Sequence, residues 1–348
     1  MKWNKMKWSS VIILLLLSLT FASCSKSEEL VVETPLEAYD NGIFMLNEGN
    51  FMTPNASVSF LSNDFQDFQA SIFSAVNPGK TLGDVAQSMT LYGDKAFILI
   101  NNSNKIEVVN RHTFASLGTI TDGLSQPRYS AVLNGKLYVT NAVSKAVTVY
   151  DAETFSKIST ISLGVTVEKI VAVSGKVYVQ NAAFGSGNTI SVIDVNTNTV
   201  TPLTLTDGVN SMEVKGTQLY VLCGNQNESV LYTINTANNQ IAATKTFPAS
   251  LSNARNMDID GDVIYFTKGN GVYRMNSNNT VINETPVFTV ADNDFSTFYG
   301  FAAINGRIYV SDAKGFVSRS SVTVYTNSGM VLVQKETGIG TNGFYLNN

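Results

Sequence analysis

The chain has 348 residues, a formal net charge of −4 and only 14% charged residues. Its lysines and arginines form no run or basic patch, which argues against a nucleic acid as partner. One histidine and two cysteines are too few for a His/Cys metal cluster or for a Ser/His or Cys/His catalytic pair in the mature chain.

The N-terminal segment, residues 1–23, is predicted to be a lipoprotein signal peptide. Three lysines precede an apolar run of 12 residues from Val11 to Ala22, which is too short to span a membrane but suits an export signal. Small residues then precede Cys24, as in a bacterial lipobox. We expect a lipid chain on Cys24 to anchor the protein to a membrane. The alternative is ordinary cleavage beside an incidental cysteine.

Residues 24–39 are predicted to form a polar tether. The pair Glu28-Glu29 follows soon after Cys24. It resembles the export signal that places Bacteroidetes lipoproteins on the outer face of the outer membrane, which implies surface display. The alternative is a linker that is merely solvated. The remaining segment, residues 40–348, has the length of one closed repeat domain.

A repeated phrase determines the expected fold of residues 40–348. It consists of a glycine, usually a polar residue, and then a short run of the form apolar–Tyr/Phe–apolar. The seven copies begin at Gly42, Gly93, Gly135, Gly175, Gly216, Gly261 and Gly306. A period of about 40–50 residues with several short strands in each unit indicates radial β-repeats. We therefore predict an all-β fold, a seven-bladed β-propeller of four-stranded antiparallel blades.

Residues 126–162 illustrate one blade. We expect its strands, named A to D from the propeller axis outward, at residues 129–133, 136–140, 146–150 and 156–162. Asn134-Gly135 suits the A–B turn, because both residues tolerate left-handed backbone geometry. Asp151 ends the C strand, where an Asx side chain can bond its own backbone in the C–D turn.

The two ends of the repeat array predict how the ring closes. The first copy starts at Gly42 with a B strand and has no A strand before it. Residues 340–348 resemble an A strand with no B strand after it. We expect this C-terminal segment to complete the first blade, because pairing there removes an open sheet edge.

The loops on one face of the propeller hold the candidate binding residues. The D–A connections and the B–C loops emerge together around the axis, on what we call the rim face. Amides and aromatic rings in these loops suit a large, polar, non-peptidic ligand, although asparagine also favours left-handed turns and aromatic rings can cap a core. The candidates are Asn47, Glu48, Asn50, Phe51, Arg128, Tyr129, Phe184, Asn225, Arg255, Asn256, Phe298, Tyr299, Phe316 and Asn342. Replacing Arg128, Arg255 or Phe298 by alanine is expected to weaken binding and to spare the melting temperature.

Candidates for catalysis or metal binding are few. His112 lies beside a predicted C–D turn, on the face opposite the rim. Residues 258–262, Asp-Ile-Asp-Gly-Asp, resemble a calcium loop, but Gly261 falls in register with the A–B turn glycines of the other repeats. Residues 292–294 suit a solvated loop, with a bound ion as the alternative. We therefore expect no catalytic residue, no metal and no cofactor.

The repeated phrase and the strand ending Val-Ile-Asp resemble the lactonase-type, YncE-like seven-bladed propellers across residues 40–348. The opening Gly-Ile-Phe-Met-Leu-Asn-Glu-Gly-Asn-Phe resembles more specifically the DUF5074-type propeller lipoproteins of Bacteroidetes. That group includes a surface-exposed cobalamin-binding lipoprotein, which passes corrinoids to a TonB-dependent outer-membrane transporter.

The resemblance implies a surface protein that captures a small-molecule ligand, with a corrinoid as the leading ligand and a TonB-dependent transporter as partner. It implies binding without chemistry. Two alternatives stay open: a scaffold or adhesin for a protein or a glycan, and an enzyme of the lactonase or quinoprotein type. A shared fold does not decide among these functions, but the shortage of histidines and acidic pairs argues against the enzyme.

Overall fold

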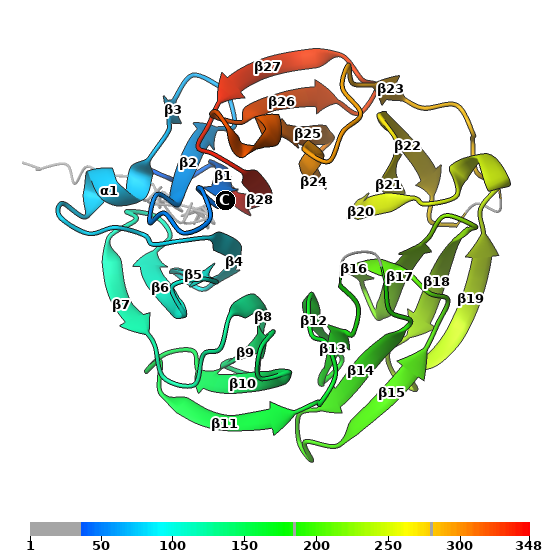
Figure 1. The fold of residues 1–348 in the computed structure, drawn as a ribbon, viewed down its shortest axis with the longest axis horizontal. Coiled ribbons are helices and arrows are strands. Elements are labelled where there is room, and N and C mark those ends of the chain that lie inside the picture. Colours follow the sequence, from blue (N-terminus) through cyan, green and yellow to red (C-terminus); the bar gives the residue numbers. More distant parts are fainter. Residues whose placement is uncertain (1–35, 184–185, 279–280) are drawn as a thin grey trace, which may run out of the picture. The chain divides into compact units, whose positions relative to one another are not determined.

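The computed structural model describes residues 36–183, 186–278 and 281–348. The predicted signal peptide, Cys24, most of the tether and Phe184 lie outside these residues. Seven four-stranded antiparallel sheets are arranged in a ring around one axis (Figure 1). The predicted class, a seven-bladed β-propeller, is confirmed.

The strands of the first three blades are given from the axis outward. Blade 1 contains β28 (Thr341–Asn347), β1 (Gly42–Asn47), β2 (Ser57–Ser62) and β3 (Phe68–Gln69). Blade 2 contains β4 (Ala86–Tyr92), β5 (Lys95–Ile100), β6 (Lys105–Asn110) and β7 (Ser116–Ile120). Blade 3 contains β8 (Pro127–Leu133), β9 (Lys136–Asn141), β10 (Ala146–Asp151) and β11 (Lys157–Ser162).

The other four blades follow the same order. Blade 4 contains β12 (Ile170–Val173), β13 (Lys176–Gln180), β14 (Thr189–Asp194) and β15 (Val200–Thr204). Blade 5 contains β16 (Val209–Lys215), β17 (Gln218–Gly224), β18 (Ser229–Asn235) and β19 (Gln240–Thr246). Blade 6 contains β20 (Arg255–Asp260), β21 (Val263–Lys268), β22 (Gly271–Asn276) and β23 (Phe288–Thr289). Blade 7 contains β24 (Thr297–Ile304), β25 (Arg307–Asp312), β26 (Ser321–Thr326) and β27 (Val331–Glu336).

Three short helical turns interrupt the strands: α1 (Ile72–Val76), η1 (Ala249–Leu251) and η2 (Lys314–Phe316). The sequence predicted no helix, and α1 falls in blade 1, where the outer strand β3 has only two residues. Its Ile72 and Phe73 are buried against the blade, so this turn covers part of the outer surface that a longer D strand covers elsewhere. Within the described residues, no helix has the length and apolarity needed to cross a membrane.

The repeated phrase reflects burial of the B strand on both faces. In β9, Leu137 and Val139 pack with blade 2, whereas Tyr138, between them, packs with blade 4. Successive side chains of a strand point to opposite faces, so a strand between two blades needs apolar side chains at every position. Cys223 in β17 follows the same rule and is fully buried as a free thiol.

The A–B turns lie where the glycines predicted them. Asn134 and Gly135 both have positive φ, 52° and 71°, as a two-residue hairpin turn of this type requires. Gly261, with φ 59°, joins β20 to β21 in the same register. Residues 258–262 are therefore the end of an A strand and its turn, as predicted. Gly42 differs from the other copies, since it begins a strand and has no positive φ.

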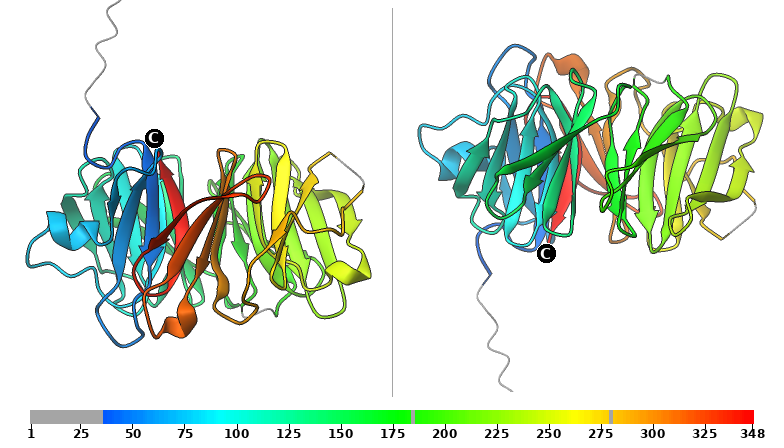
Figure 2. Two further views of the ribbon diagram at one scale, coloured as in Figure 1. Left: turned by 90° about the horizontal axis from the view of Figure 1, so that it is seen from above. Right: turned by 90° about the horizontal axis from the view of Figure 1, so that it is seen from below.

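The C-terminal strand closes the ring as predicted. In blade 1, β28 pairs with β1 in antiparallel register, Gly42 opposite Asn347 and Met45 opposite Phe344. The Nδ2 of Asn347 donates to the Tyr39 carbonyl oxygen at 2.6 Å, so the last strand also holds the start of the propeller. The C-terminus and the A–B turns lie on one face, which we call the turn face, and η2 lies on the opposite, rim face (Figure 2).

Candidate ligand-binding site on the rim face

A cavity of about 600 Å³ opens on the rim face between blades 1, 2, 3 and 7. We call it the rim cavity. Eight of the fourteen candidate residues line it: Glu48, Asn50, Phe51, Arg128, Tyr129, Tyr299, Phe316 and Asn342. Closure of the ring by β28 brings these residues together from distant parts of the sequence.

Glu48 is held at the floor of the rim cavity by two donors. Its Oε1 accepts a hydrogen bond from Asn342 Nδ2 at 2.8 Å, and its Oε2 accepts one from the Tyr299 hydroxyl at 2.8 Å. Burial raises the pKa of Glu48, and these two hydrogen bonds oppose that rise. The Oδ1 of Asn342 is buried with no hydrogen-bond partner in the described part of the chain. The floor therefore offers acceptors to a ligand that carries hydrogen-bond donors.

Arg128 supplies the cationic part of the floor. Its Nε donates to Glu168 Oε2 at 2.9 Å, and its Nη1 donates to Gln87 Oε1 at 2.5 Å. Both charged partners are mostly buried, with side-chain exposures of 22% for Arg128 and 12% for Glu168. Burial raises the pKa of Glu168, and the adjacent guanidinium opposes that rise. The ion pair therefore fixes the guanidinium in one orientation beside Glu48.

Arg128→Ala is expected to destabilise the fold, because it leaves the Glu168 carboxylate mostly buried and without its cationic partner. This differs from the expectation from sequence, which was an unchanged melting temperature. The expected loss is about 2 kcal/mol of unfolding free energy, measured by urea denaturation. The double variant Arg128→Ala/Glu168→Gln should recover most of it. Equal unfolding curves for Arg128→Ala and the parent protein would show that the pair contributes nothing to stability.

Aromatic rings form the wall and mouth of the rim cavity. The Phe316 ring packs edge-on against Tyr299, with 4.8 Å between centroids, and lies parallel to Phe295 at 6.4 Å. Asn50 Nδ2 donates to the Phe316 carbonyl oxygen at 2.9 Å and so joins the B–C loops of blades 1 and 7. Phe51 is 70% exposed at the mouth. These rings present apolar area beside a polar floor, a combination that ligand sites use.

A second rim-face cavity of about 350 Å³ lies between blades 6 and 7. The candidates Arg255, Asn256, Phe298 and Tyr299 line it, and Tyr299 lines the rim cavity as well. Phe298 is only 5% exposed and packs in the core between these two blades. Its replacement by alanine should therefore lower the melting temperature, which differs from the expectation from sequence. Arg255 is exposed, and its Nε and Nη2 donate hydrogen bonds to Asn253 Oδ1.

Two candidates lie in neither cavity. Asn47 is the last residue of β1 and fully buried, with its Nδ2 bonded to Ser57 and Ser59 and its Oδ1 accepting from Thr341. It therefore stabilises the closure of blade 1. Asn225 organises the B–C turn of blade 5, where its Oδ1 accepts from the backbone N–H groups of residues 227 and 228.

Val85, Gln87 and Asn101 also line the rim cavity but are absent from the fourteen candidates. Asn101 directly follows the B strand β5 and belongs to the amide-rich B–C loops that the sequence singled out. Gln87 lies inside β4, whereas the candidates were chosen from the loops of the rim face. No sequence signal separates it from Ser88 and Thr90, the other polar residues of this strand.

The centre of the ring contains a third cavity of about 530 Å³, the axial channel. Its walls are the inner strands of the blades (Figure 1). The polar and charged residues that line it are Gln87, Tyr129, Lys169, Glu213, Asp258, Asp260, Asn305, Asn342 and Tyr345. Glu213, which lies within β16, is not among the residues that the sequence singled out, and the repeat register indicated only a turn role for Asp258 and Asp260.

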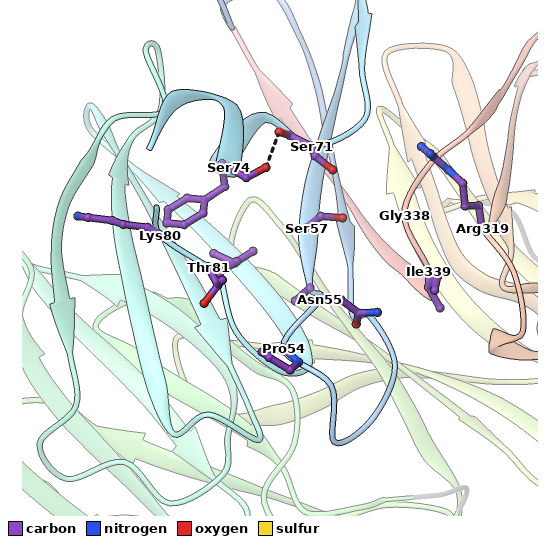
Figure 3. Close-up of a pocket in the computed structure, with 13 residues that line it drawn as sticks. Pro54, Asn55, Ser57, Ser71, Ser74, Lys80, Thr81, Arg319, Gly338 and Ile339 are labelled. Atoms are coloured by element: carbon purple, nitrogen blue, oxygen red, sulfur yellow. Dashed lines mark hydrogen bonds between the residues drawn. The ribbon is translucent and has the colours of Figure 1, made fainter. Parts of the chain in front are cut away.

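A further hollow of about 330 Å³ lies at the outer edge of blade 1 (Figure 3). Its two cationic side chains, Lys80 and Arg319, lie on opposite sides of the hollow and do not converge. Lys80 Nζ donates to Ser116 Oγ at 3.1 Å, and Arg319 Nε donates to the Thr337 carbonyl oxygen at 2.7 Å. The hollow therefore has no pair of cationic groups positioned to bind one ligand group together.

His112 lies in the C–D turn of blade 2, as predicted, where its Nδ1 is 2.5 Å from Asp40 Oδ1. This contact fastens the root of the tether on the turn face. In the loop 292–294, Asp294 Oδ1 accepts from the backbone N–H groups of Ser296 and Thr297. Within the described ranges, no group of three or more His, Cys, Asp or Glu side chains is placed to hold a metal ion.

The model of a family described as "Domain of unknown function (DUF5074)" matches residues 41–338. No curated protein matches the sequence. A quinonprotein alcohol dehydrogenase-like protein from Bacteroides thetaiotaomicron superposes with a TM-score of 0.68 at 14% identity, covering 89% of this chain and 79% of that one. Hydrazine synthase from Kuenenia stuttgartiensis gives 0.60 at 18% identity, covering 73% and 87%. At these identities the likeness shows the fold alone.

Proposed function

We propose that this chain, which belongs to the DUF5074 family, is a surface lipoprotein whose rim cavity captures a corrinoid-type nutrient. In this proposal Cys24 carries the lipid in the outer membrane, and residues 24–39 tether the propeller outside the cell. A TonB-dependent outer-membrane transporter receives the ligand. The protein binds and releases the ligand without chemical change.

The observation that carries the proposal is the convergence of eight candidate residues on one cavity. A corrinoid is a flat macrocycle fringed with carboxamide arms. The exposed ring of Phe51 and the half-buried ring of Phe316 supply apolar area for the macrocycle. The Glu48–Asn342 pair and Arg128 supply acceptors and donors for the arms. Tyr299 joins the rim cavity to the second cavity, so a ligand wider than one cavity can lie across both.

Titration calorimetry with cyanocobalamin tests the proposal. Phe51→Ala and Phe316→Ala should each weaken binding about tenfold or more, because each variant removes apolar ring area that would contact the ligand in the complex. Phe51→Ala should leave the melting temperature unchanged, since this ring is already exposed in the free protein. Met330→Ala is the matched control, because Met330 is 65% exposed at the C–D turn of blade 7.

Absence of any heat with cyanocobalamin at micromolar protein would remove the corrinoid from the proposal. Recovery of a transporter by the immobilised propeller, without small-molecule affinity, would then favour the scaffold or adhesin. Binding of an oligosaccharide lost in Phe51→Ala would instead favour a glycan at the same cavity. Turnover of a lactone or an alcohol, abolished by Glu48→Gln, would favour the enzyme.

A further inference from the structure

The rim cavity and the axial channel share part of their walls. Gln87, Tyr129 and Asn342 line both of them. Gln87 Nε2 reaches the Tyr129 hydroxyl at 3.4 Å, and Asn342 Nδ2 donates to the Gln87 carbonyl oxygen at 3.0 Å. The two cavities therefore adjoin at these three polar residues, so a ligand arm in the rim cavity lies next to the channel.

Carboxyl groups outnumber cationic groups along this path. Glu48 and Arg128 line the rim cavity, and Glu168 pairs with Arg128 behind it. The channel holds Lys169 from blade 4, Glu213 from blade 5, and Asp258 and Asp260 from blade 6. Five carboxyl groups thus accompany two cationic groups in the described structure. An anionic ligand group on this path would meet repulsion at short range, where little solvent screens it.

The inner end of the channel offers an unused acceptor. Both carboxylate oxygens of Asp258 accept a backbone N–H, from Ile259 and from Ala303, each at 2.7 Å. In the described structure the Glu213 carboxyl accepts no hydrogen bond. Burial, and then the neighbouring Asp258, raise the pKa of Glu213, whereas Lys169 opposes the rise. Glu213 is half-buried and lines the channel, so its carboxyl oxygens are open to accept a hydrogen bond from a donor brought in by a ligand.

We propose that the axial channel is an extension of the binding site that admits a neutral or cationic, hydrogen-bond-donating ligand arm and excludes an anionic one. Glu213 is the hydrogen-bond acceptor at the inner end of the channel, and the neighbouring Asp258 places a second carboxyl group beside Glu213. The inference rests on the proposed function in one respect, that the rim cavity holds the body of the ligand. A carboxamide or an amine has the required chemistry, whereas a carboxylate or a phosphate does not.

Calorimetry with arm-modified corrinoids tests this proposal. The probes are cyanocobalamin and its three monocarboxylates, in each of which a propionate replaces one propionamide arm. We expect one monocarboxylate, whose altered arm enters the channel, to bind about tenfold or more weakly than the parent. Glu213→Gln should reduce that difference. Glu336→Gln, which removes an exposed charge from the outer strand β27, should preserve it. Equal affinity for all four ligands would overturn the proposal.

A second measurement separates this proposal from the identity of the nutrient. Spermidine at about 5 mM should raise the melting temperature of the parent protein, because a ligand that binds only the folded state stabilises it. The rise should disappear in Glu213→Gln/Asp258→Asn and persist in Glu336→Gln. If cyanocobalamin gives no heat but spermidine behaves in this way, the corrinoid is wrong and the channel site stands. If spermidine has the same effect on all three proteins, the channel does not select a cation.

Discussion

Removal of residues 340–348 is expected to prevent folding, or to lower the melting temperature on the order of 10 °C or more. These residues include all of β28, the inner strand of blade 1. Phe344 packs with Met45 and Tyr309 between blades 1 and 7, and the Tyr345 hydroxyl accepts from the Met89 N–H of blade 2 at 3.0 Å. One strand thus joins blade 1 to both of its neighbours.

The magnitude follows from what the deletion exposes. Loss of the buried Phe344 side chain alone costs about 3 kcal/mol or more. The backbone of β1 loses its partner strand along residues 42–47, and each buried group left unpaired costs about 1–3 kcal/mol. The total reaches the whole stability of an ordinary domain, about 5–15 kcal/mol.

Calorimetric melting of the truncated and parent proteins measures this effect. The matched control removes residues 25–36 from the other end, which leaves Tyr39 and its contacts in place. A synthetic peptide of residues 340–348 should restore part of the lost melting temperature by pairing with β1. A truncated protein that melts with the parent would show that the closure does not stabilise the ring.

The sequence predicted the fold well because the repeated phrase encodes local geometry. A positive φ at Gly135 and burial of both faces of β9 each follow from a few adjacent residues. The closure by β28 was predictable for a different reason, since an incomplete first blade leaves an unpaired strand that the chain must cover. The helical turn α1 was not predictable, because it replaces a D strand and has only five residues.

The candidate site was predictable only in part. The position of a loop in the repeat predicts the face of the propeller on which it lies, but not which residues of other blades lie beside it. Glu48, Arg128 and Phe316 come from separate blades, and only the closed ring shows that they share a cavity. Asn47 has the residue type of a binding loop, yet it is buried as the last residue of a strand. Glu213 lies inside a strand, and nothing adjacent to it in sequence shows whether its side chain faces the channel or the outer solvent.

The stability of the protein is expected to fall as the pH rises above about 4.3, the ordinary pKa of a glutamate in an unfolded chain. Burial raises the pKa of Glu213 and of Asp258 in the folded state. Between the unfolded and the raised values the folded protein binds more protons, so each pH increase favours the unfolded chain. The stability that these groups contribute is complete below the unfolded pKa and is lost once the pH passes the folded pKa.

Glu213→Gln removes most of this pH dependence, because an amide cannot ionise in the channel. At pH 9 we expect the variant to unfold at a higher urea concentration than the parent, with an unfolding free energy larger by about 1–3 kcal/mol. At pH 5 the unfolding free energies of the two proteins should differ little. Because Glu213 is only half-buried, screening by solvent limits the effect to this range. Glu336→Gln, on the exposed outer strand, should follow the parent at both pH values. A parent protein whose stability rises between pH 5 and pH 9 through Glu213 would mean that Lys169 pairs with this carboxylate and outweighs its desolvation.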